Sequence, residues 1–355
     1  LPRHRARWAA ARRHVVGFDE LVLRAPRPAH RLESWVADLL GPAEGPPEDI
    51  SGGLWRRRRG AEEAGWPPAA LHQERRKFLL RAGGSTWLLK FAGLGAEGER
   101  KAALARALSA AGFTPPCAGW RHGFLVERWI EDARPLEAAA AGRPAVIERI
   151  GRYLAFRARR FPADAASGAA PARLLDMARQ NATEALGTAA GALFGRWSPA
   201  RLEGEIRRVV TDNRMHAWEW LCLPDGRVLK ADAVDHHAAH DLVGCQDVAW
   251  DVAGAVVELA LGPAELARLR AVLEACWGRS LSRPLLEAML PCYASFQLGC
   301  HALAAEALAS VPAERARLER AARRYACRLE AMLRPPGASG RAVFHGTRAV
   351  FHGTR

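Results

Sequence analysis

The chain has 355 residues, of which 49% are hydrophobic, so it can bury a substantial core and form one large domain or two lobes. Its net charge of +14 would favour a nucleic acid or an acidic surface as partner. However, only four of the 52 basic residues are lysine, namely Lys77, Lys90, Lys101 and Lys230. Abundant arginine with alanine, glycine and proline is typical of a GC-rich coding bias, so the charge alone does not favour nucleic-acid binding.

The first 70 residues predict an N-terminal extension of uncertain fold. Residues 14–23 have the pattern of a strand, and residues 30–41 that of a short amphipathic helix. A proline- and glycine-rich span at 41–53 and four consecutive arginines at 56–59 follow. These glycines and arginines precede the first clear strand, where a loop covering phosphates could lie, but a linker is the simpler interpretation.

Residues 71–131 predict a small β lobe with one embedded helix. Gly83-Gly84 joins two apolar runs and is typical of a hairpin turn. The helix carries acidic residues in its first turn and ends at Gly112. The expected strands span 75–82, 85–93, 118–120 and 123–130, with the helix at 95–112.

Residues 132–335 predict a larger helical lobe, so the expected fold class is α+β. Prolines at 162, 171 and 199 divide the helices, and the segment 222–232 predicts a hairpin around Asp225-Gly226. The last residues, 336–355, contain AVFHGTR twice and predict a disordered tail.

Cysteine spacing and hydropathy limit the compartment. The seven cysteines form no CxxC pair, which argues against a disulfide framework or a zinc knuckle and favours the cytoplasm. No run of about 18 apolar residues is present, and the arginine-rich start lacks the apolar segment of a signal peptide. We therefore expect no membrane partner.

One short segment, residues 211–255, concentrates the acidic and imidazole side chains. Such a cluster needs positive charge nearby, so it indicates bound metal, proton transfer or pairing with arginine. Its members are Asp212, Glu219, Asp232, Asp235, Asp241, Asp247 and Asp251, with His216, His236, His237 and His240.

Phosphoryl transfer from ATP would use such residues. It needs a cation on the donor phosphates, Mg²⁺ held by hard oxygen ligands, and a carboxylate that orients the acceptor hydroxyl. Lys90 is a candidate for the cation because it lies inside an apolar strand of a chain that uses arginine almost everywhere else. An exposed surface lysine is the alternative.

The segment 75–335 resembles the aminoglycoside phosphotransferase and choline kinase group, which shares the two-lobed protein-kinase fold. The resemblance rests on TWLLKF, GFLVERWIEDARPL, TDNRMHAWEWLCLPDGRVLKAD and GCQDVAWDVAGA. It implies that Lys90 contacts the ATP phosphates and that Glu99 or Glu97 is its helix partner. It also implies that the hinge around Glu127, Arg128 and Trp129 meets the adenine.

In that group a catalytic loop of pattern HGDxxxxN precedes a hairpin and a metal-binding aspartate. The resemblance implies Asp212 as catalytic base, Glu219 and Asp232 or Asp235 as Mg²⁺ ligands, and Asp247 and Asp251 as structural residues. This chain departs from the pattern because VT precedes Asp212, Glu219 replaces the asparagine, and their spacing is seven residues instead of five.

The first hypothesis is an ATP- and Mg²⁺-dependent phosphotransferase acting on a small-molecule hydroxyl. The departures favour, as an alternative, a catalytically degenerate kinase-like binding or regulatory protein. A third hypothesis, a DHH-type phosphoesterase, rests on the triplet Asp235-His236-His237 and on the four-residue spacing of His236 and His240, which suits Mn²⁺. That class needs acidic motifs on parallel strands, which the sequence before Asp232 does not offer.

Overall fold

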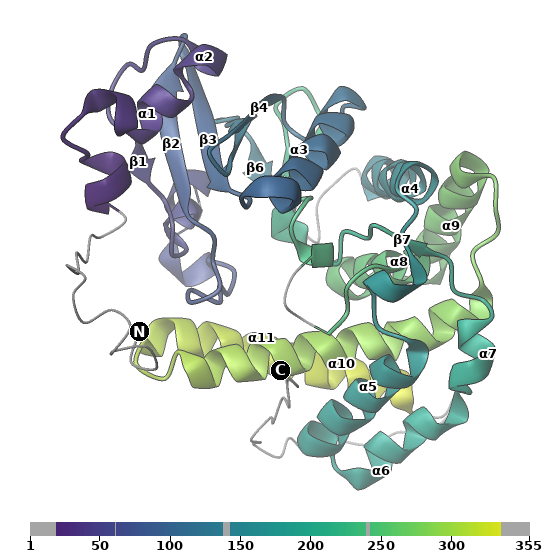
Figure 1. Cartoon of the computed structure of the whole chain (residues 1–355). Helices are drawn as coiled ribbons and strands as arrows, with labels where there is room; N and C mark the ends of the chain where they lie inside the picture. The colour runs from purple at the N-terminus through teal and green to yellow at the C-terminus, as the bar shows by residue number, and fades with distance from the viewer. Residues whose placement is uncertain (1–18, 61, 138–142, 239–241, 335–355) are drawn as a thin grey trace, which may run out of the picture.

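The structure is a computed structural model, and it describes residues 19–60, 62–137, 143–238 and 242–334. A β-sheet lobe and a helical lobe are joined by the segment that follows β5 (Phe124–Arg128) (Figure 1). The α+β, two-lobed architecture predicted from the sequence is confirmed. The boundaries predicted at residues 70 and 131 stay predictions, and the predicted tail at 336–355 lies outside the described residues.

A five-stranded antiparallel sheet of order β1-β2-β3-β5-β4 forms the small lobe. Gly83 and Gly84 turn β2 into β3 with φ angles of 58° and 65°, as a two-residue hairpin turn requires, so the predicted hairpin is confirmed. Besides β5, the elements are β1 (Glu48–Asp49), β2 (Lys77–Ala82), β3 (Ser85–Phe91), α3 (Gly95–Ala110) and β4 (Cys117–Arg121).

The two faces of this sheet have different partners. Phe78, Leu80 and Leu89 belong to a cluster with Leu32 and Val36, so α1 (Leu32–Trp35) and α2 (Ala37–Leu40) cover the outer face. Side chains alternate along a strand, and the cross-strand pairs Leu79–Leu88 and Lys77–Lys90 therefore share the inner face. This inner face carries the lysine singled out in the sequence.

Two expectations for the N-terminal extension were wrong. In the described part of 14–23, Asp19–Leu23 forms a helical turn instead of a strand, and Val22 packs against the sheet cluster. The glycines and arginines before the first clear strand were interpreted as a linker, but this region begins with β1, which pairs with the edge of β2. The helix predicted at 30–41 exists in two parts that meet at Val36.

The large lobe is a helical bundle around one extensive core, in which α8 and α10 bury Trp250 and Tyr293. None of its described helices has the length and apolarity needed to cross a bilayer. Its helices are α4 (Arg143–Arg160), α5 (Pro171–Leu186), α6 (Thr188–Ala192), α7 (Pro199–Glu203), α8 (Val248–Leu259), α9 (Pro263–Trp277), α10 (Arg283–Ala307) and α11 (Pro312–Leu333).

Short strands connect this bundle to the small lobe. The predicted hairpin at Asp225-Gly226 is confirmed as β8 (Trp220–Cys222) and β9 (Val228–Lys230), which pair with β6 (Arg134–Pro135). β7 (Arg208–Val209) pairs with β10 (Gln246–Asp247). The loop after β9 therefore begins at the boundary between the lobes.

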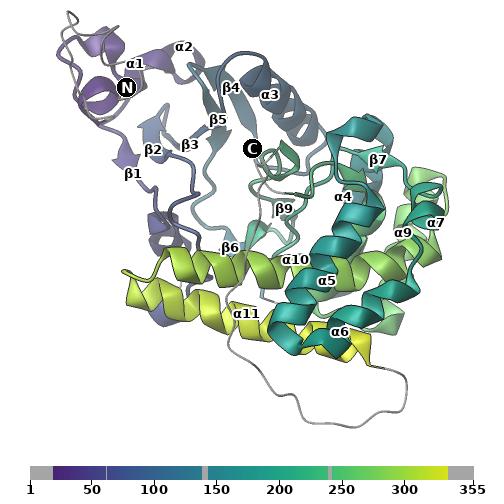
Figure 2. The same ribbon diagram turned by 60° about the horizontal axis from the view of Figure 1, so that its bottom comes forward.

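The connection between β1 and β2 is unusually long, and we call its described residues, 50–60 and 62–76, the strap. It leaves the sheet and reaches the paired helices α10 and α11 (Figures 1 and 2). Ala70 and Leu71 pack there against Ala304, Leu308 and Leu318. The strap therefore bridges the two lobes on the side of the sheet's inner face.

Candidate functional site

Lys90 on β3 meets the helical lobe directly. Its side chain is almost fully buried, and its ammonium group donates to Asp232 and lies 2.7 Å from Asp235. Burial alone would lower the pKa of Lys90, but Asp232, Asp235 and Glu127 outweigh it and raise the pKa above its ordinary value. Lys90 is thus a permanent cation in the gap between the lobes.

The loop after β9 holds the two aspartates in place. Asp232 has a left-handed φ of 52°, which is unusual for a residue other than glycine and is characteristic of functional sites. Asp235 also lies 3.0 Å from Lys101 on α3. Two lysines of the small lobe therefore bind two carboxylates of the large lobe.

Asp232 also belongs to a group that could hold a metal ion. One ligand atom from each of Glu219, Asp232 and His236 lies within 4.8 Å of the others. Burial lowers the pKa of His236 well below its ordinary value, and its buried Nε2 has no hydrogen-bond partner among the described residues. Two hard oxygen donors and a neutral imidazole fit Mg²⁺ or Mn²⁺.

This group differs from the predicted ligands. Glu219 and Asp232 come together as expected, whereas Asp235 is held by Lys90 and Lys101, and His236 takes its place. The His236–His240 pair of the DHH hypothesis cannot be followed, because His240 lies outside the described residues. All strand pairs among the described residues are antiparallel, which does not match the parallel strands that hypothesis needs.

Asp212 does not lie where an acceptor could reach it. Its side chain has no exposed surface, and it accepts a hydrogen bond from Tyr153. Lys230 lies 3.3 Å and Arg157 3.7 Å from its carboxylate. A carboxylate enclosed by two cations and a phenol is a structural anchor, so this geometry does not support the predicted role of catalytic base.

The backbone at Asp212 explains the shift in spacing. The amide groups of Asp212 and Asn213 both donate to Asp251, at 2.8 Å each, and Asn213 has a left-handed φ of 64°. In the HGDxxxxN pattern, counting five residues back from Glu219 places Asn213 at the glycine and Arg214 at the catalytic aspartate. Asp251 is therefore structural, as predicted, and so is Asp247, which caps α8.

Arg214 is the residue that sequence reasoning missed. Burial lowers the pKa of Arg214, but the negative charges of Glu219 and Asp232 outweigh the effect of burial, so the pKa lies above its ordinary value. Its guanidinium group has no hydrogen bond or ion pair within the described chain, although its backbone amide donates to Asp212. The signal in the sequence that could have identified Arg214 was its spacing of five residues from Glu219, which is the spacing in the HGDxxxxN pattern.

All four lysines of the chain gather around this site. Lys90 and Lys101 bind the aspartates, Lys230 binds Glu219 at 2.7 Å and Asp212 at 3.3 Å, and Lys77 lowers the pKa of Asp232. A compact ammonium group can approach two carboxylates where a planar guanidinium would not fit.

Among the described residues, Lys90 forms no hydrogen bond or ion pair with the glutamates of α3 that were predicted as its helix partner. Glu99 is exposed on α3, and Glu97 pairs with Arg100 and, at 3.4 Å, with Lys101. The register of α3 therefore turns Lys101, and not a glutamate, toward Asp235 of the large lobe.

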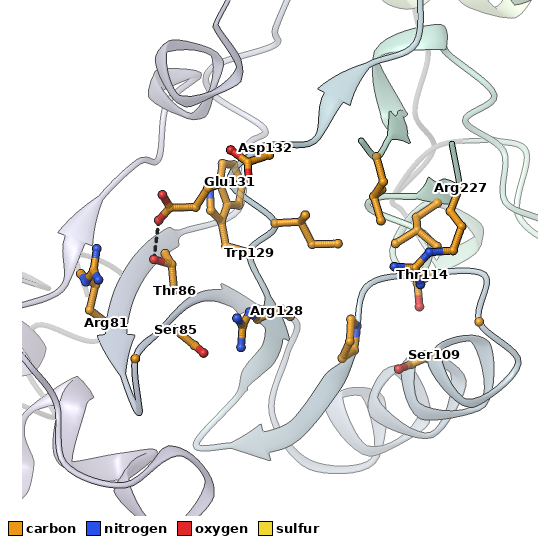
Figure 3. Close-up of a pocket in the computed structure, with 16 residues that line it drawn as sticks. Arg81, Ser85, Thr86, Ser109, Thr114, Arg128, Trp129, Glu131, Asp132 and Arg227 are labelled. Carbon is orange, nitrogen blue, oxygen red and sulfur yellow. Dashed lines mark hydrogen bonds between the residues drawn. The ribbon is translucent and has the colours of Figure 1, made fainter. Parts of the chain in front are cut away.

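The hinge residues Glu127, Arg128 and Trp129 lie beside the cleft at the end of β5. Glu127 shares the inner face with Leu88, and burial, with Asp232 and Asp235, raises its pKa to about 7 against the opposing effect of Lys90. Arg128 and Trp129 line a cavity of about 620 Å³ together with Thr86, Glu131 and Arg227 (Figure 3). Lys90 and Asp232 are not among its lining residues, so this cavity does not include the contact between Lys90 and Asp232.

The sequence matches no protein-family model and no curated protein. Several solved structures resemble the chain, among them the following two. One is a choline/ethanolamine kinase family protein from Mesorhizobium loti, with 15% identity, a TM-score of 0.52, and coverage of 89% of this chain and 93% of that one. The other is a putative aminoglycoside phosphotransferase from Ralstonia eutropha, with 16% identity, a TM-score of 0.52, and coverage of 85% and 97%.

The chain has the two-lobed protein-kinase-like fold. The resemblance predicted from the sequence is thereby confirmed at the level of the fold. At such low identity, function has to be argued from the residues of the site.

Proposed function

We propose that the protein is an ATP- and Mg²⁺-dependent phosphotransferase that acts on the hydroxyl group of a small molecule. The observation that carries this proposal is the convergence of Lys90 from the small lobe with Asp232 of the large lobe, beside Glu219 and His236. Lys90 would bind the donor phosphates, with Glu219, Asp232 and His236 as metal ligands. Bound Mg²⁺ would neutralise charge on the β- and γ-phosphates.

Arg214 fits such a reaction without a carboxylate base. Phosphoryl transfer passes through a loose transition state, in which positioning and charge neutralisation matter more than early removal of the acceptor proton. The guanidinium group of Arg214, whose charged form Glu219 and Asp232 favour, would stabilise the charge on the transferred group. Arg214 thus replaces Asp212 as the residue we expect to act in the reaction.

The unpaired cysteines support the cytoplasm as the compartment. All seven are free, as proteins of a reducing environment require.

A second candidate function is a kinase-like binding or regulatory protein without turnover. The burial of Asp212 and the arginine at position 214 favour it, because the described site offers no free carboxylate at the position of the base. This candidate also binds Mg²⁺·ATP in the same cleft, so only turnover separates the two.

ADP formation from ATP, measured across a panel of amino alcohols and aminoglycosides, tests the proposal. We expect acceptor-dependent ADP release that falls at least about a hundredfold in Asp232→Asn, because a metal ligand is lost. Asp176→Asn is the matched control, since Asp176 is exposed on α5 and pairs only with Arg179 among the described residues. Mg²⁺·ATP binding without turnover on any acceptor would favour the second candidate, and no nucleotide binding would contradict both.

A further inference from the structure

The inner face of the small sheet is already covered. Ile50, Leu79 and Trp129 form a buried cluster to which Trp55 of the strap and Leu88 are added. Leu88 lies two residues before Lys90 and points to the same side of the strand, and the ammonium group of Lys77 lies 5.7 Å from the Trp55 ring. An indole thus packs on the apolar surface next to the site we assign to the phosphates.

Trp55 is fixed in this position by its neighbours. Its indole nitrogen donates to Glu74 at 2.8 Å, and the other oxygen of Glu74 accepts from the amide of Gly53 at 2.7 Å. The amide of Trp55 donates to Ile50 at 3.0 Å. The ring is therefore held against the sheet by both ends of the strap.

Arg59 occupies the edge of the hinge. Its guanidinium group donates to the carbonyl groups of Ile130 at 2.9 Å and Ala133 at 3.2 Å, and it lies 3.7 Å from the centre of the Trp129 ring. Burial lowers its pKa to about 10, and no carboxylate pairs with it among the described residues. A flat donor group that stacks on an aromatic ring and bonds hinge carbonyls resembles a nucleotide base in its contacts.

The strap is anchored on the large lobe. The two terminal nitrogens of the Arg56 guanidinium group donate to Glu314 on α11, at 2.9 and 3.0 Å, and both side chains are almost fully buried. Glu314 also accepts from the amide of Ala69 at 2.7 Å. The strap therefore runs from the sheet of the small lobe to α11 of the large lobe and is fixed at both ends.

We propose that the strap is an intramolecular plug, in which Trp55 and Arg59 hold the place of the nucleotide base until a nucleotide displaces them. This inference rests on the proposed function, since it concerns the same cleft. A ligand that binds only the open form has an apparent affinity reduced by the open fraction. The plug thus keeps nucleotide affinity low while the strap is seated.

Titration of the full chain with Mg²⁺·ATP, followed by calorimetry, tests the plug. We expect Arg59→Ala to bind at least about tenfold more tightly than the unmodified chain. Arg58→Ala is the matched control, because Arg58 is exposed and pairs with Glu48, and its affinity should equal that of the unmodified chain. If the unmodified chain binds and Arg59→Ala binds no more tightly, the plug is overturned and the proposed function stands; if neither binds, the proposed function fails and the plug with it.

Trypsin cleavage of the unmodified chain provides a second measurement that does not depend on a variant folding. The plug predicts that saturating Mg²⁺·ATP accelerates cleavage after Arg57, Arg58 and Arg59 relative to cleavage elsewhere, because the strap leaves the cleft. Unchanged or slower cleavage there, with nucleotide bound, would overturn the plug.

Discussion

Individual lysines mark the site more clearly than the acidic cluster does. Lys90 and Lys230 are almost fully buried, and each contacts two carboxylates. Burying a charge is costly unless it is paired, so these contacts offset the loss of hydration. The acidic residues by contrast divide into two groups, since Asp247 and Asp251 hold backbone amides and Asp232 faces Lys90.

Glu127 gives a prediction at the scale of one residue. Its folded pKa of about 7 lies above the ordinary 4.5, so the unfolded chain loses this proton first. Folded stability is therefore lost as pH rises from about 4.5 to 7, and the cost persists above pH 7. We expect Glu127→Gln to raise the free energy of unfolding by about 1–3 kcal/mol at pH 8, and by less at pH 5.

Urea unfolding of the variant at both pH values measures this difference. Glu99→Gln is the control, since Glu99 is exposed on α3 and should change stability little at either pH. An equal effect of Glu127→Gln at pH 5 and pH 8 would show that burial of an ionised carboxylate is not the cause.

Among the elements, the strap depends on a buried ion pair with the large lobe. Its anchor, the pair formed by Arg56 and Glu314, is buried on both sides, and removing one partner leaves the other charge unpaired. We expect Glu314→Gln to lower the free energy of unfolding by about 3–5 kcal/mol, measured by urea unfolding. Glu319→Gln, in an exposed pair with Arg315 on the same helix, should cost about 0.5 kcal/mol or less. Similar losses in the two variants would contradict the anchoring role.

Elements with strong local signals were predictable from the sequence. The hairpins at Gly83-Gly84 and Asp225-Gly226 and the apolar strand around Lys90 follow from turn chemistry and alternation. The two-residue strand β1 and the course of the strap were not predictable, because they depend on contacts with β2 and with Glu314, far along the chain. The same holds for His236, which joins Glu219 only through the pairing of β8 with β9.

The loop between Thr211 and Glu219 shows how a sequence pattern can be matched two residues out of register. Asp212 was chosen because it is the carboxylate nearest to the expected place. The left-handed Asn213 and the two amides bound to Asp251 instead align Arg214 with the pattern's aspartate. Backbone conformation of this kind is set by tertiary contacts, so the sequence could offer only the spacing from Glu219.

At the scale of the whole molecule, charged contacts and the strap tie the lobes together. Lys90 and Lys101 of the small lobe bind Asp235 of the large one, and the strap joins the sheet to α11. A nucleotide between the lobes would have to compete with both connections. If nucleotide binds there as proposed, we expect its binding to be linked to interlobe stability.

The affinity of the unmodified chain for ATP, measured by calorimetry with Mg²⁺ and with a chelator, tests the central claim most directly. We predict that Mg²⁺ tightens binding at least about tenfold and that Asp232→Asn loses this effect, because one ligand of the metal is removed. Lack of binding, or binding that is equally strong without Mg²⁺ and in Asp232→Asn, would contradict a metal–nucleotide site formed by Lys90, Glu219, Asp232 and His236.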